Sequence, residues 1–388
     1  MTDQQKLAVV CSHPIQYFAP WFRWLSENLD AALRVFYLDN PASRDGADPG
    51  FGQAVTWDTP LLSGYDCEFV ENTAADPGTH HFRGLRNPAL WPALARYGPA
   101  ATLLMTYRYE SILPAMIRGR LPANTWLRGD STLLARPDGL RRRLADSVIR
   151  RAFHSLAGAL FVGQHNRAYF RHHGIDEQHL RRSPPAVDSD HFCPAPEVRE
   201  EAAAWRRRLK LERSQPLVLF VGKLQSIKRP LLVLSAFRRA RLGRATLAFV
   251  GTGELEGELR EAIGDDPQVH LLGFRNQGAL PAIYAAANLL VLPSVSETWG
   301  LVVNEAFSLG LPAIVSDRVG CAPDMVAGRE TGAVFTHDDE AALASTLGEA
   351  LSQPERLAGW GRNAQALAKA EFSFDAMSQG VVHMLEQA

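Results

Sequence analysis

Residues 296–310 read Ser-Glu-Thr-Trp-Gly-Leu-Val-Val-Asn-Glu-Ala-Phe-Ser-Leu-Gly and cross from a predicted strand into a predicted helix. The preceding apolar run, residues 288–294, is typical of a buried parallel strand. A helix is predicted from Gly300 to the end of the stretch. Glu297 is therefore expected in the loop at the carboxyl end of the strand, and Glu305 on the second helical turn.

Glu297 and Glu305 have seven residues between them. The free N–H groups at the helix start form an anion site. A carboxylate beside it is repelled by an anion and is better placed to accept hydrogen bonds from hydroxyl groups. Two such carboxylates indicate two hydroxyl-bearing rings flanking a diphosphate, which is the layout of a nucleotide-sugar. In the structural alternative, Glu297 only favours a helix N-terminus through the macrodipole, and Glu305 is a solvated helix residue.

The spacing Glu297-x7-Glu305 resembles the signature of retaining glycosyltransferases of family 4, also called glycosyl transferases group 1. The resemblance covers residues 160–388 well and the first 130 in broad outline. Further motifs that carry it are Phe220-Val-Gly-Lys-Leu224, Ser226-Ile-Lys-Arg-Pro230, Phe249-Val-Gly-Thr-Gly253, Leu271-Leu-Gly-Phe274 and Leu280-Pro-Ala-Ile-Tyr-Ala-Ala-Ala-Asn288.

This resemblance implies an α/β protein with the GT-B fold, in which two Rossmann-like parallel-sheet domains face a central cleft. The expected acceptor-binding domain is residues 1–190, joined by the C-terminal helix 373–388. The expected nucleotide-sugar-binding domain is residues 191–372.

Composition agrees with two soluble globular domains, because 388 residues are too many for one ordinary core. The formal net charge of −1 gives no global field, so nucleic acid is not expected as a partner. The four cysteines are scattered without metal-ligand spacing, which favours buried free thiols. No apolar stretch approaches the roughly 20 residues of a spanning helix. A cytoplasmic protein is expected, at most peripheral on the inner face of a membrane.

Short apolar strands alternate with amphipathic helices in both halves, which favours parallel sheets. Residues 40–90 are rich in Gly, Pro, Asp and Asn and are expected to form long irregular loops. The strands expected in the first half lie at 7–11, 33–38, 125–128 and 158–162. Those expected in the second half lie near 217–221, 246–250, 268–272, 288–292 and 313–316.

Lys223 and Lys228 follow the strand at 217–221, where the resembled family carries a basic diphosphate-binding pair. A cation there offsets the charge that builds on a departing diphosphate. The family more often has arginine at the first position, so Lys223 is a departure. The alternative is a pair of solvated lysines.

A glycine-rich turn follows the next strand, at Gly251-Thr-Gly253, and superficially resembles a dinucleotide-binding loop. It lies on the second strand of its domain and no acidic residue ends the following strand, so a dehydrogenase is not predicted. The resemblance makes it a nucleotide-proximal loop instead. The donor-binding residues implied in total are Lys223, Lys228, Gly251, Gly273, Phe274, Arg275, Glu297, Thr298, Trp299, Gly300, Leu301 and Glu305.

In the first domain, His13 follows the first strand, where the family usually has a glycine pair. Here Pro14-Ile-Gln-Tyr17 replaces that pair, which removes a glycine-based phosphate site. An imidazole there is expected to bond the acceptor or donor, with Gln16 and Tyr17 beside the acceptor. The alternative is a hydrogen-bonded structural histidine.

Asp130 stands near the position where many relatives have a histidine facing the donor sugar. It is expected to orient the acceptor hydroxyl, with Arg128 binding nearby. The structural alternative is an Arg128–Asp130 pair with Ser131 capping the next helix. The expected catalytic residues are thus Glu297, Lys228, Asp130 and His13.

A basic stretch between Arg136 and Arg151 has Leu140, Leu144 and Ile149 interleaved. This pattern is typical either of an amphipathic helix that meets an anionic bilayer or of a solvated helix face.

Together these features predict metal-independent transfer of a hexosyl unit from a UDP- or GDP-sugar to a hydroxyl of a saccharide or lipid-linked acceptor, with retention. No cofactor or metal is expected, since the Asp188-Ser-Asp190 sequence lies in the interdomain stretch and lysines supply the positive charge. The alternatives are a nucleotide-sugar 2-epimerase or hydrolase on the same scaffold, and a non-catalytic nucleotide-sugar-binding subunit.

Overall fold

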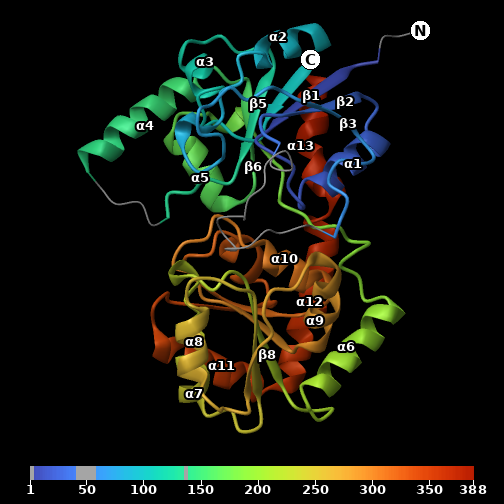
Figure 1. Cartoon of the computed structure of the whole chain (residues 1–388), viewed down its shortest axis with the longest axis vertical. Helices are drawn as coiled ribbons and strands as arrows, with labels where there is room; N and C mark the ends of the chain where they lie inside the picture. The colour runs from blue at the N-terminus through green and yellow to red at the C-terminus, as the bar shows by residue number, and fades with distance from the viewer. Residues whose placement is uncertain (1–3, 41–57, 135–138) are drawn as a thin grey trace. The chain divides into compact units, whose positions relative to one another are not determined.

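The structure is a computed structural model that describes residues 4–40, 58–134 and 139–388 (Figure 1). These residues form two compact units. The first unit holds described residues up to 40, from 60 to 184 and from 374 to 388. The second holds residues 58–59 and 185–373. Its long segment begins at Pro185, whereas the sequence analysis expected the boundary at residue 191.

The first unit is built on a seven-stranded parallel sheet in the order β3-β2-β1-β4-β5-β6-β7. Its central strands are apolar and buried, as expected for a sheet with helices on both faces. The strands are β1 (Lys6–Cys11), β2 (Ala32–Tyr37), β3 (Asp66–Phe69), β4 (Ala101–Leu104), β5 (Thr125–Gly129), β6 (Gly158–Phe161) and β7 (Leu180–Arg182).

Helices cover this sheet and connect its strands. They are α1 (Ala19–Asn28), α2 (Leu90–Tyr97), α3 (Leu113–Ile117), α4 (Leu140–Phe153), α5 (Gln164–His172) and α13 (Phe374–Glu386), with short 3₁₀ turns η2 (Phe82–Gly84) and η3 (Glu177–His179). The described residues of the stretch 40–90 are mostly irregular, as expected, but β3 and η2 lie within it. Residues 41–57 lie outside the described residues.

The second unit has a six-stranded parallel sheet in the order β10-β9-β8-β11-β12-β13. Four of its strands, β8, β9, β11 and β12, are completely buried apolar runs or nearly so, which explains why the sequence predicted them well. The strands are β8 (Leu217–Val221), β9 (Thr246–Val250), β10 (Val269–Leu271), β11 (Leu289–Leu292), β12 (Ala313–Ser316) and β13 (Gly332–Phe335).

The helices of the second unit follow the expected strand–helix alternation. Three of them, α6, α7 and α12, begin at a proline, whose fixed φ and missing N–H suit the first helical turn. The helices are α6 (Pro196–Arg208), α7 (Pro230–Ala240), α8 (Glu256–Ile263), α9 (Leu280–Ala286), α10 (Leu301–Ser308), α11 (Glu340–Leu351) and α12 (Pro354–Glu371). Shorter turns are η4 (Ser226–Lys228), η5 (Gln277–Ala279) and the π-helical η6 (Ala322–Val326).

Each sheet has one point where the chain reverses its direction of winding. In the first sheet this point lies between β1 and β4, and in the second it lies between β8 and β11. Open parallel sheets bind ligands outside the carboxyl ends of the strands at such a point. The loops after β1, β8 and β11 are therefore the natural places for a site.

The last helix, α13, belongs to the first unit and is drawn in red among its blue and green elements (Figure 1). The buried Trp21 indole donates a hydrogen bond to Ser378 Oγ at 2.9 Å, and Ser183 Oγ donates one to the Met377 carbonyl at 2.7 Å. Gly380 lies so close to Leu160 that a Cβ there would come within 2.9 Å of its side chain. None of the helices in the described residues is long and apolar enough to cross a lipid bilayer.

Candidate active site

Lys228 and Glu297 meet at the winding reversal of the second sheet. Lys228 ends η4, in the loop after β8, and Glu297 lies in the loop after the neighbouring strand β11. The Lys228 ammonium forms an ion pair with Glu297 Oε2, and the two side chains are 22% and 17% exposed. A backbone hydrogen bond from Val295 N to Ile227 O, 3.0 Å long, joins the two loops. The sequence analysis had placed both residues at the donor, and the structure brings them into direct contact.

The backbone of Glu297 is fixed on both sides. Its N–H donates to Arg318 O at 3.2 Å and its carbonyl accepts from Gly320 N at 2.9 Å, next to an isolated bridge with Val319. The buried Ser294 hydroxyl donates to the Glu297 carboxylate at 3.4 Å. The side chain of Glu297 is therefore held toward the loop after β8 before any ligand arrives.

Glu305 lies on the second turn of α10, as predicted, and is completely buried. The Tyr284 hydroxyl, from α9, donates a hydrogen bond to Glu305 Oε2. This contact orients the carboxylate from within the unit. Because Glu305 has no exposed surface in the free protein, a contact with a ribose requires that the groups covering it move when a nucleotide binds.

Three glycines end the neighbouring strands β8, β9 and β10. Gly251 N donates to Gly273 O at 2.9 Å, and Gly222 N donates to Val250 O at 3.0 Å. A Cβ on Gly251 would lie 1.9 Å from the carbonyl oxygen of Gly222, at a φ of +135°. Gly273 has a φ of +70°, which favours glycine. The predicted donor residues Gly251 and Gly273 thus shape the strand ends through their backbone.

The other predicted donor residues differ in accessibility. Trp299 is buried, donates its indole N–H to Asn304 Oδ1 at 2.8 Å, and packs on Phe372 with ring centroids 5.9 Å apart. Its side chain is therefore part of the core. Thr298 is exposed, and Lys223, Phe274 and Leu301 are half-buried. Helix α10 begins at Leu301. Gly300 caps α10 with a φ of +104°, and Arg275 places its guanidinium 5.3 Å from the ring centroid of Trp205.

In the first unit, the loop from β1 to α1 carries His13, Gln16 and Tyr17, all of them half-buried. The Ser12 hydroxyl lies 3.0 Å from His13 Nδ1, and Cys11 Sγ donates to the His13 carbonyl at 3.4 Å. The loop follows β1 at the winding reversal, which is the position expected of ligand-binding residues.

Arg128 is buried on β5 and has a packing role. Its guanidinium donates to Ser183 Oγ at 3.0 Å and to Ser183 O at 3.1 Å, and lies 5.4 Å from the ring centroid of Trp21. Burial lowers the pKa of Arg128 to about 10, although the charge of Asp130 acts in the opposite direction and raises this pKa. These contacts give Arg128 a packing role through Ser183 and Trp21, and its binding of the acceptor stays a prediction. Ser131 does not cap a helix at this point, because its carbonyl accepts from Asn166 Nδ2 at 2.8 Å and α4 begins only at residue 140.

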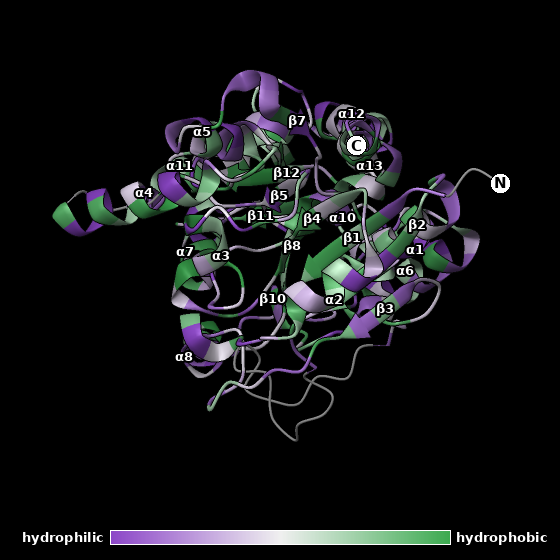
Figure 2. Cartoon of the chain, turned by 90° about the horizontal axis from the view of Figure 1, so that it is seen from above, coloured by the Kyte–Doolittle hydropathy of each residue, from purple (hydrophilic) through white to green (hydrophobic). Residues whose placement is uncertain are grey.

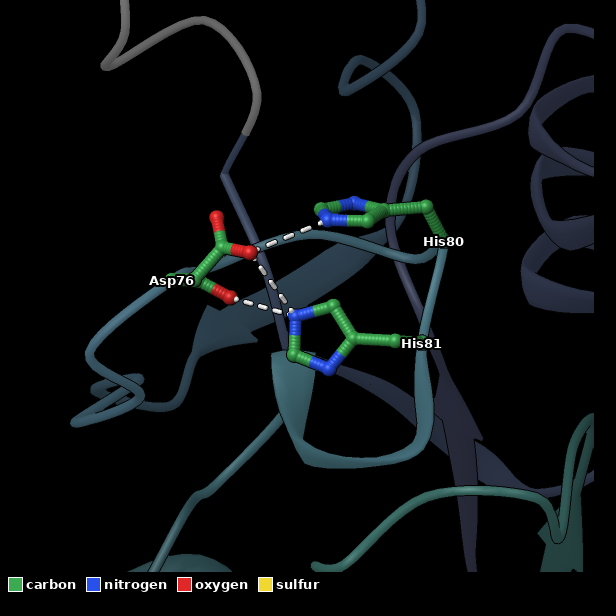
Figure 3. A group of neighbouring side chains, drawn as sticks. All are labelled: Asp76, His80 and His81. Atoms are coloured by element: carbon green, nitrogen blue, oxygen red, sulfur yellow. Dashed lines mark hydrogen bonds and ion pairs between the residues drawn. The ribbon is translucent and has the colours of Figure 1, made fainter.

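Two groups of side chains in the described residues have the composition of a metal site. In the first, His80 Nε2 and His81 Nε2 each lie 3.2 Å from Asp76 Oδ2 (Figure 3). The second is made of Asp146, His172 and His173. In both groups, ordinary hydrogen bonds of the imidazoles to the aspartate account for the geometry, with His81 also bonding to the Asp76 carbonyl. Asp188 accepts from the backbone N–H of Asp190 at 3.0 Å and so belongs to a turn.

A family model for glycosyl transferases group 1 matches residues 201–367. These residues are similar to a group 1 glycosyl transferase domain. The matched stretch contains the ion pair of Lys228 with Glu297, the three strand-end glycines and Glu305.

Curated glycosyltransferases are similar to about half of this chain. The chain is 33% identical over 217 residues to a D-inositol 3-phosphate glycosyltransferase of Gordonia bronchialis, an alignment that covers 52% of this chain and 46% of the relative. It is 30% identical over 230 residues to a GDP-mannose-dependent alpha-(1-6)-phosphatidylinositol monomannoside mannosyltransferase of Mycolicibacterium smegmatis, covering 56% and 59%. The chain spans about half the length of the curated relatives it matches.

Solved structures resemble the whole chain in fold. The Anabaena protein Alr3699/HepE in complex with UDP has a TM-score of 0.73 at 16% identity, covering 99% of this chain and 100% of that one. Sucrose-phosphate synthase from Thermosynechococcus elongatus has a TM-score of 0.73 at 20% identity, covering 99% and 98%. These likenesses confirm the GT-B fold that the sequence predicted, with its two parallel-sheet α/β domains.

The group 1 domain contains three supporting residues to which the sequence analysis gave no role. Tyr284 holds Glu305, Ser294 holds Glu297, and Asn304 connects the Trp299 indole to the Pro185 carbonyl through a 2.8 Å hydrogen bond. Tyr284 and Asn304 lie within motifs that carried the resemblance. Their polarity among apolar helix neighbours is the signal that could have identified them, because buried polar groups need partners.

Proposed function

We propose that this protein is a retaining glycosyltransferase that moves a hexosyl unit from a UDP- or GDP-sugar to a hydroxyl of a saccharide or glycolipid acceptor without a metal ion. The observation that carries the proposal is the Lys228–Glu297 pair at the winding reversal of a group 1 domain. The named substrates of the relatives support this donor class, since one uses GDP-mannose and a protein of the same fold is bound to UDP.

Lys228 supplies positive charge to the departing diphosphate, together with Lys223. Charge grows on the diphosphate as the sugar–phosphate bond breaks, so a fixed cation stabilises the transition state more than the ground state. The Glu297 carboxylate forms an ion pair with the Lys228 ammonium. Donor binding therefore exchanges one anion for another at this lysine, and Glu297 is released toward the sugar.

The two glutamates then divide the recognition of the donor. Glu297, fixed in the loop after β11, accepts hydrogen bonds from hydroxyls of the transferred sugar. Glu305, oriented by Tyr284, accepts them from the ribose. The nucleobase is held by backbone groups of the Gly273-Phe274-Arg275 turn, and Thr298, Gly300 and Leu301 surround the phosphates at the start of α10.

The acceptor is bound by the first unit through His13, Gln16, Tyr17 and Asp130. Its hydroxyl oxygen bonds to the anomeric carbon on the face that the diphosphate leaves, and the diphosphate takes the hydroxyl proton. Configuration is thereby retained without a protein nucleophile. Asp130 and His13 orient the hydroxyl for this step.

Transfer is tested by incubating the protein with UDP- and GDP-hexoses, with and without saccharide and glycolipid acceptors, in excess chelator. A thermal-shift screen of nucleoside diphosphates selects the donor first, because a ligand that binds the folded state raises its apparent stability. The proposal is supported if nucleoside diphosphate is released only with acceptor and the release survives the chelator. The product must also keep the anomeric configuration of the donor. Rapid release without acceptor would indicate a hydrolase or epimerase instead, and binding without turnover a non-catalytic subunit.

A further inference from the structure

Helix α4 exposes a row of apolar side chains. Eight large apolar side chains are exposed among the described residues, and three of them lie on this one helix. Leu140 is 74% exposed, Leu144 61% and Val148 44%. A spacing of four residues places all three on the same face, so they form one continuous ridge. Ile149, the third apolar residue noted in this basic stretch, instead packs against the core of its unit.

The opposite face of α4 is anchored, so the ridge cannot turn inward. Asp146 Oδ1 lies 3.0 Å from His173 Nε2 and Asp146 Oδ2 lies 3.3 Å from His172 Nε2, both on or directly after α5. Phe153 is buried in the core at the C-terminal end of the helix. Figure 1 shows the N-terminal half of α4 projecting away from the sheet of its unit.

Arginines border the apolar ridge on both sides. At 100° per residue, Arg141 lies on one side of the ridge, and Arg143 and Arg150 lie on the other. Arg151 lies in line with the ridge itself, beyond Val148. All four are exposed. The acidic residue of the helix, Asp146, faces the histidines on the anchored side. Figure 2 shows the resulting alternation of green apolar and purple polar residues along the projecting part of α4.

We propose that this surface of α4, made of Leu140, Leu144, Val148 and the bordering Arg141, Arg143 and Arg151, docks on an anionic lipid bilayer. Aliphatic side chains flanked by cations are the composition of helices that lie in the plane of a membrane interface. The leucines and the valine enter the acyl boundary, and the guanidinium groups bind lipid phosphates by paired N–H donors. Charge complementarity selects an anionic surface, since the described part of α4 exposes cations beside the ridge and no carboxylate.

Vesicle sedimentation tests this docking with the full chain. Phosphatidylcholine vesicles, with and without 30–40% or so phosphatidylglycerol, are compared at low and high salt. We expect binding to the anionic vesicles only, weakened by salt because the charge term is screened. Neutralising Arg141 and Arg143 together (Arg141→Gln, Arg143→Gln) should weaken partitioning roughly 25-fold, at about fivefold per arginine. The triple variant Leu140→Ser, Leu144→Ser, Val148→Ser should weaken it more than tenfold at either salt concentration.

Matched control variants carry the same changes elsewhere on the surface. Arg207→Gln with Arg213→Gln removes two exposed arginines from the second unit, and Leu62→Ser with Val382→Ser removes exposed apolar side chains. Both should bind as the parent protein does. Unchanged circular dichroism and thermal unfolding of the α4 variants show that they are folded. Equal binding to neutral vesicles, no binding to any vesicle, or equal loss in the control variants would overturn the proposal. The assay contains no sugar donor, so its result does not depend on the proposed transfer.

Discussion

The ammonium group of Lys228 is paired with the carboxylate of Glu297 across 69 residues of sequence. The pair joins the ends of two strands that lie side by side in the sheet but are separated by two strands in the chain. The Lys228 side chain is only 22% exposed, and a partly buried cation is stabilised by a counter-charge. The proposed diphosphate-binding lysine is thus held in position by Glu297.

Replacing Lys228 by alanine should lower kcat far more than it raises the KM for the donor. The charge that Lys228 offsets grows toward the transition state, and loss of such a group costs about 10²–10³ in rate. Lys228→Arg should restore part of the rate, since a planar guanidinium replaces a compact charge at a different reach. Steady-state kinetics with varied donor measure both constants. A Lys228→Ala variant with normal kcat would remove this lysine from the mechanism.

Glu297→Gln and Glu305→Gln should separate sugar recognition from ribose recognition. Glu305→Gln should weaken binding of the bare nucleoside diphosphate by about 1.5–3 kcal/mol, or ten- to a hundredfold, because a charged hydrogen-bond acceptor is lost. Glu297→Gln should leave that affinity nearly unchanged and lower kcat/KM for transfer by about two orders of magnitude. Calorimetry with the nucleoside diphosphate and transfer kinetics provide the two readouts. Equal loss of nucleotide affinity in both variants would contradict the assigned division.

Tyr284→Phe should act at a distance through Glu305. The change removes the hydroxyl that donates to the buried carboxylate, and leaves a phenyl ring of the same shape. We expect a loss of about 1.5–3 kcal/mol in the free energy of unfolding, because the carboxylate loses a charge-assisted partner. Nucleoside diphosphate affinity should fall as well. Denaturant unfolding and calorimetry measure the two effects, and Tyr97→Phe, which removes a hydroxyl bonded to the Ala32 carbonyl in the other unit, is the control that should leave affinity unchanged.

Gly251→Ala should destabilise the second unit severely. A Cβ at residue 251 would lie 1.9 Å from the Gly222 carbonyl oxygen, and the φ of +135° is unfavourable for any other residue. Separating the two strand ends should cost more than about 3 kcal/mol. The matched change Gly257→Ala lies on α8 with open space around it, and should stabilise by about 0.5–1 kcal/mol. Thermal unfolding distinguishes them, and similar melting temperatures for the two variants would contradict the close approach.

Acidification should release the anchor of α4. Burial raises the pKa of Asp146, but the hydrogen bonds from His173 and His172 outweigh it, so the pKa lies below its usual 3.8. The group therefore contributes stability that is fully present above pH 3.8 and is lost as pH falls through the lowered pKa. His172, His173 and Arg142 are the charged or titratable groups that face it.

Asp146→Asn isolates this contribution. Its stability deficit relative to the parent protein should shrink as pH falls through the lowered pKa of the parent carboxylate. Hydrogen exchange should show faster exchange of the α4 amides in the variant at neutral pH. A deficit that does not change down to the acid unfolding transition would mean that Asp146 is not held ionised by the histidines.

Much of the second unit could be predicted because its strands are short, continuous apolar runs. The predicted 217–221, 246–250 and 313–316 coincide with β8, β9 and β12. The sequence analysis missed β3, β4, β7 and β13 for physical reasons. β3 and β7 are edge strands with charged residues, β13 begins with a glycine, and the four residues of β4 lie inside a longer apolar run that periodicity cannot divide.

The positions of Glu297 and Lys228 at strand ends followed from local sequence, but their contact did not. That contact depends on β8 and β11 being neighbours, which is a property of the sheet order. Burial of Trp299 and Arg128 was equally beyond local pattern, because each is enclosed by residues far away in the chain: Phe372 for Trp299, and Ser183 for Arg128. Local sequence predicts the loop on which a side chain lies. Packing against residues far away in the chain determines the contacts of that side chain.

The return of α13 to the first unit has a consequence for synthesis on the ribosome. The Trp21 indole N–H and the Ser183 hydroxyl both donate to residues of α13, so the first unit lacks these partners until residues 374–386 have been made. At about 5–20 residues per second, the roughly 190 residues that separate β7 from α13 take about 10–40 s to translate. All residues of the second unit have been synthesised before α13, the last helix of the first unit, is available. The nascent chain should therefore fold its C-terminal half first. During that interval the surface of the first unit that α13 later covers should be exposed to chaperones.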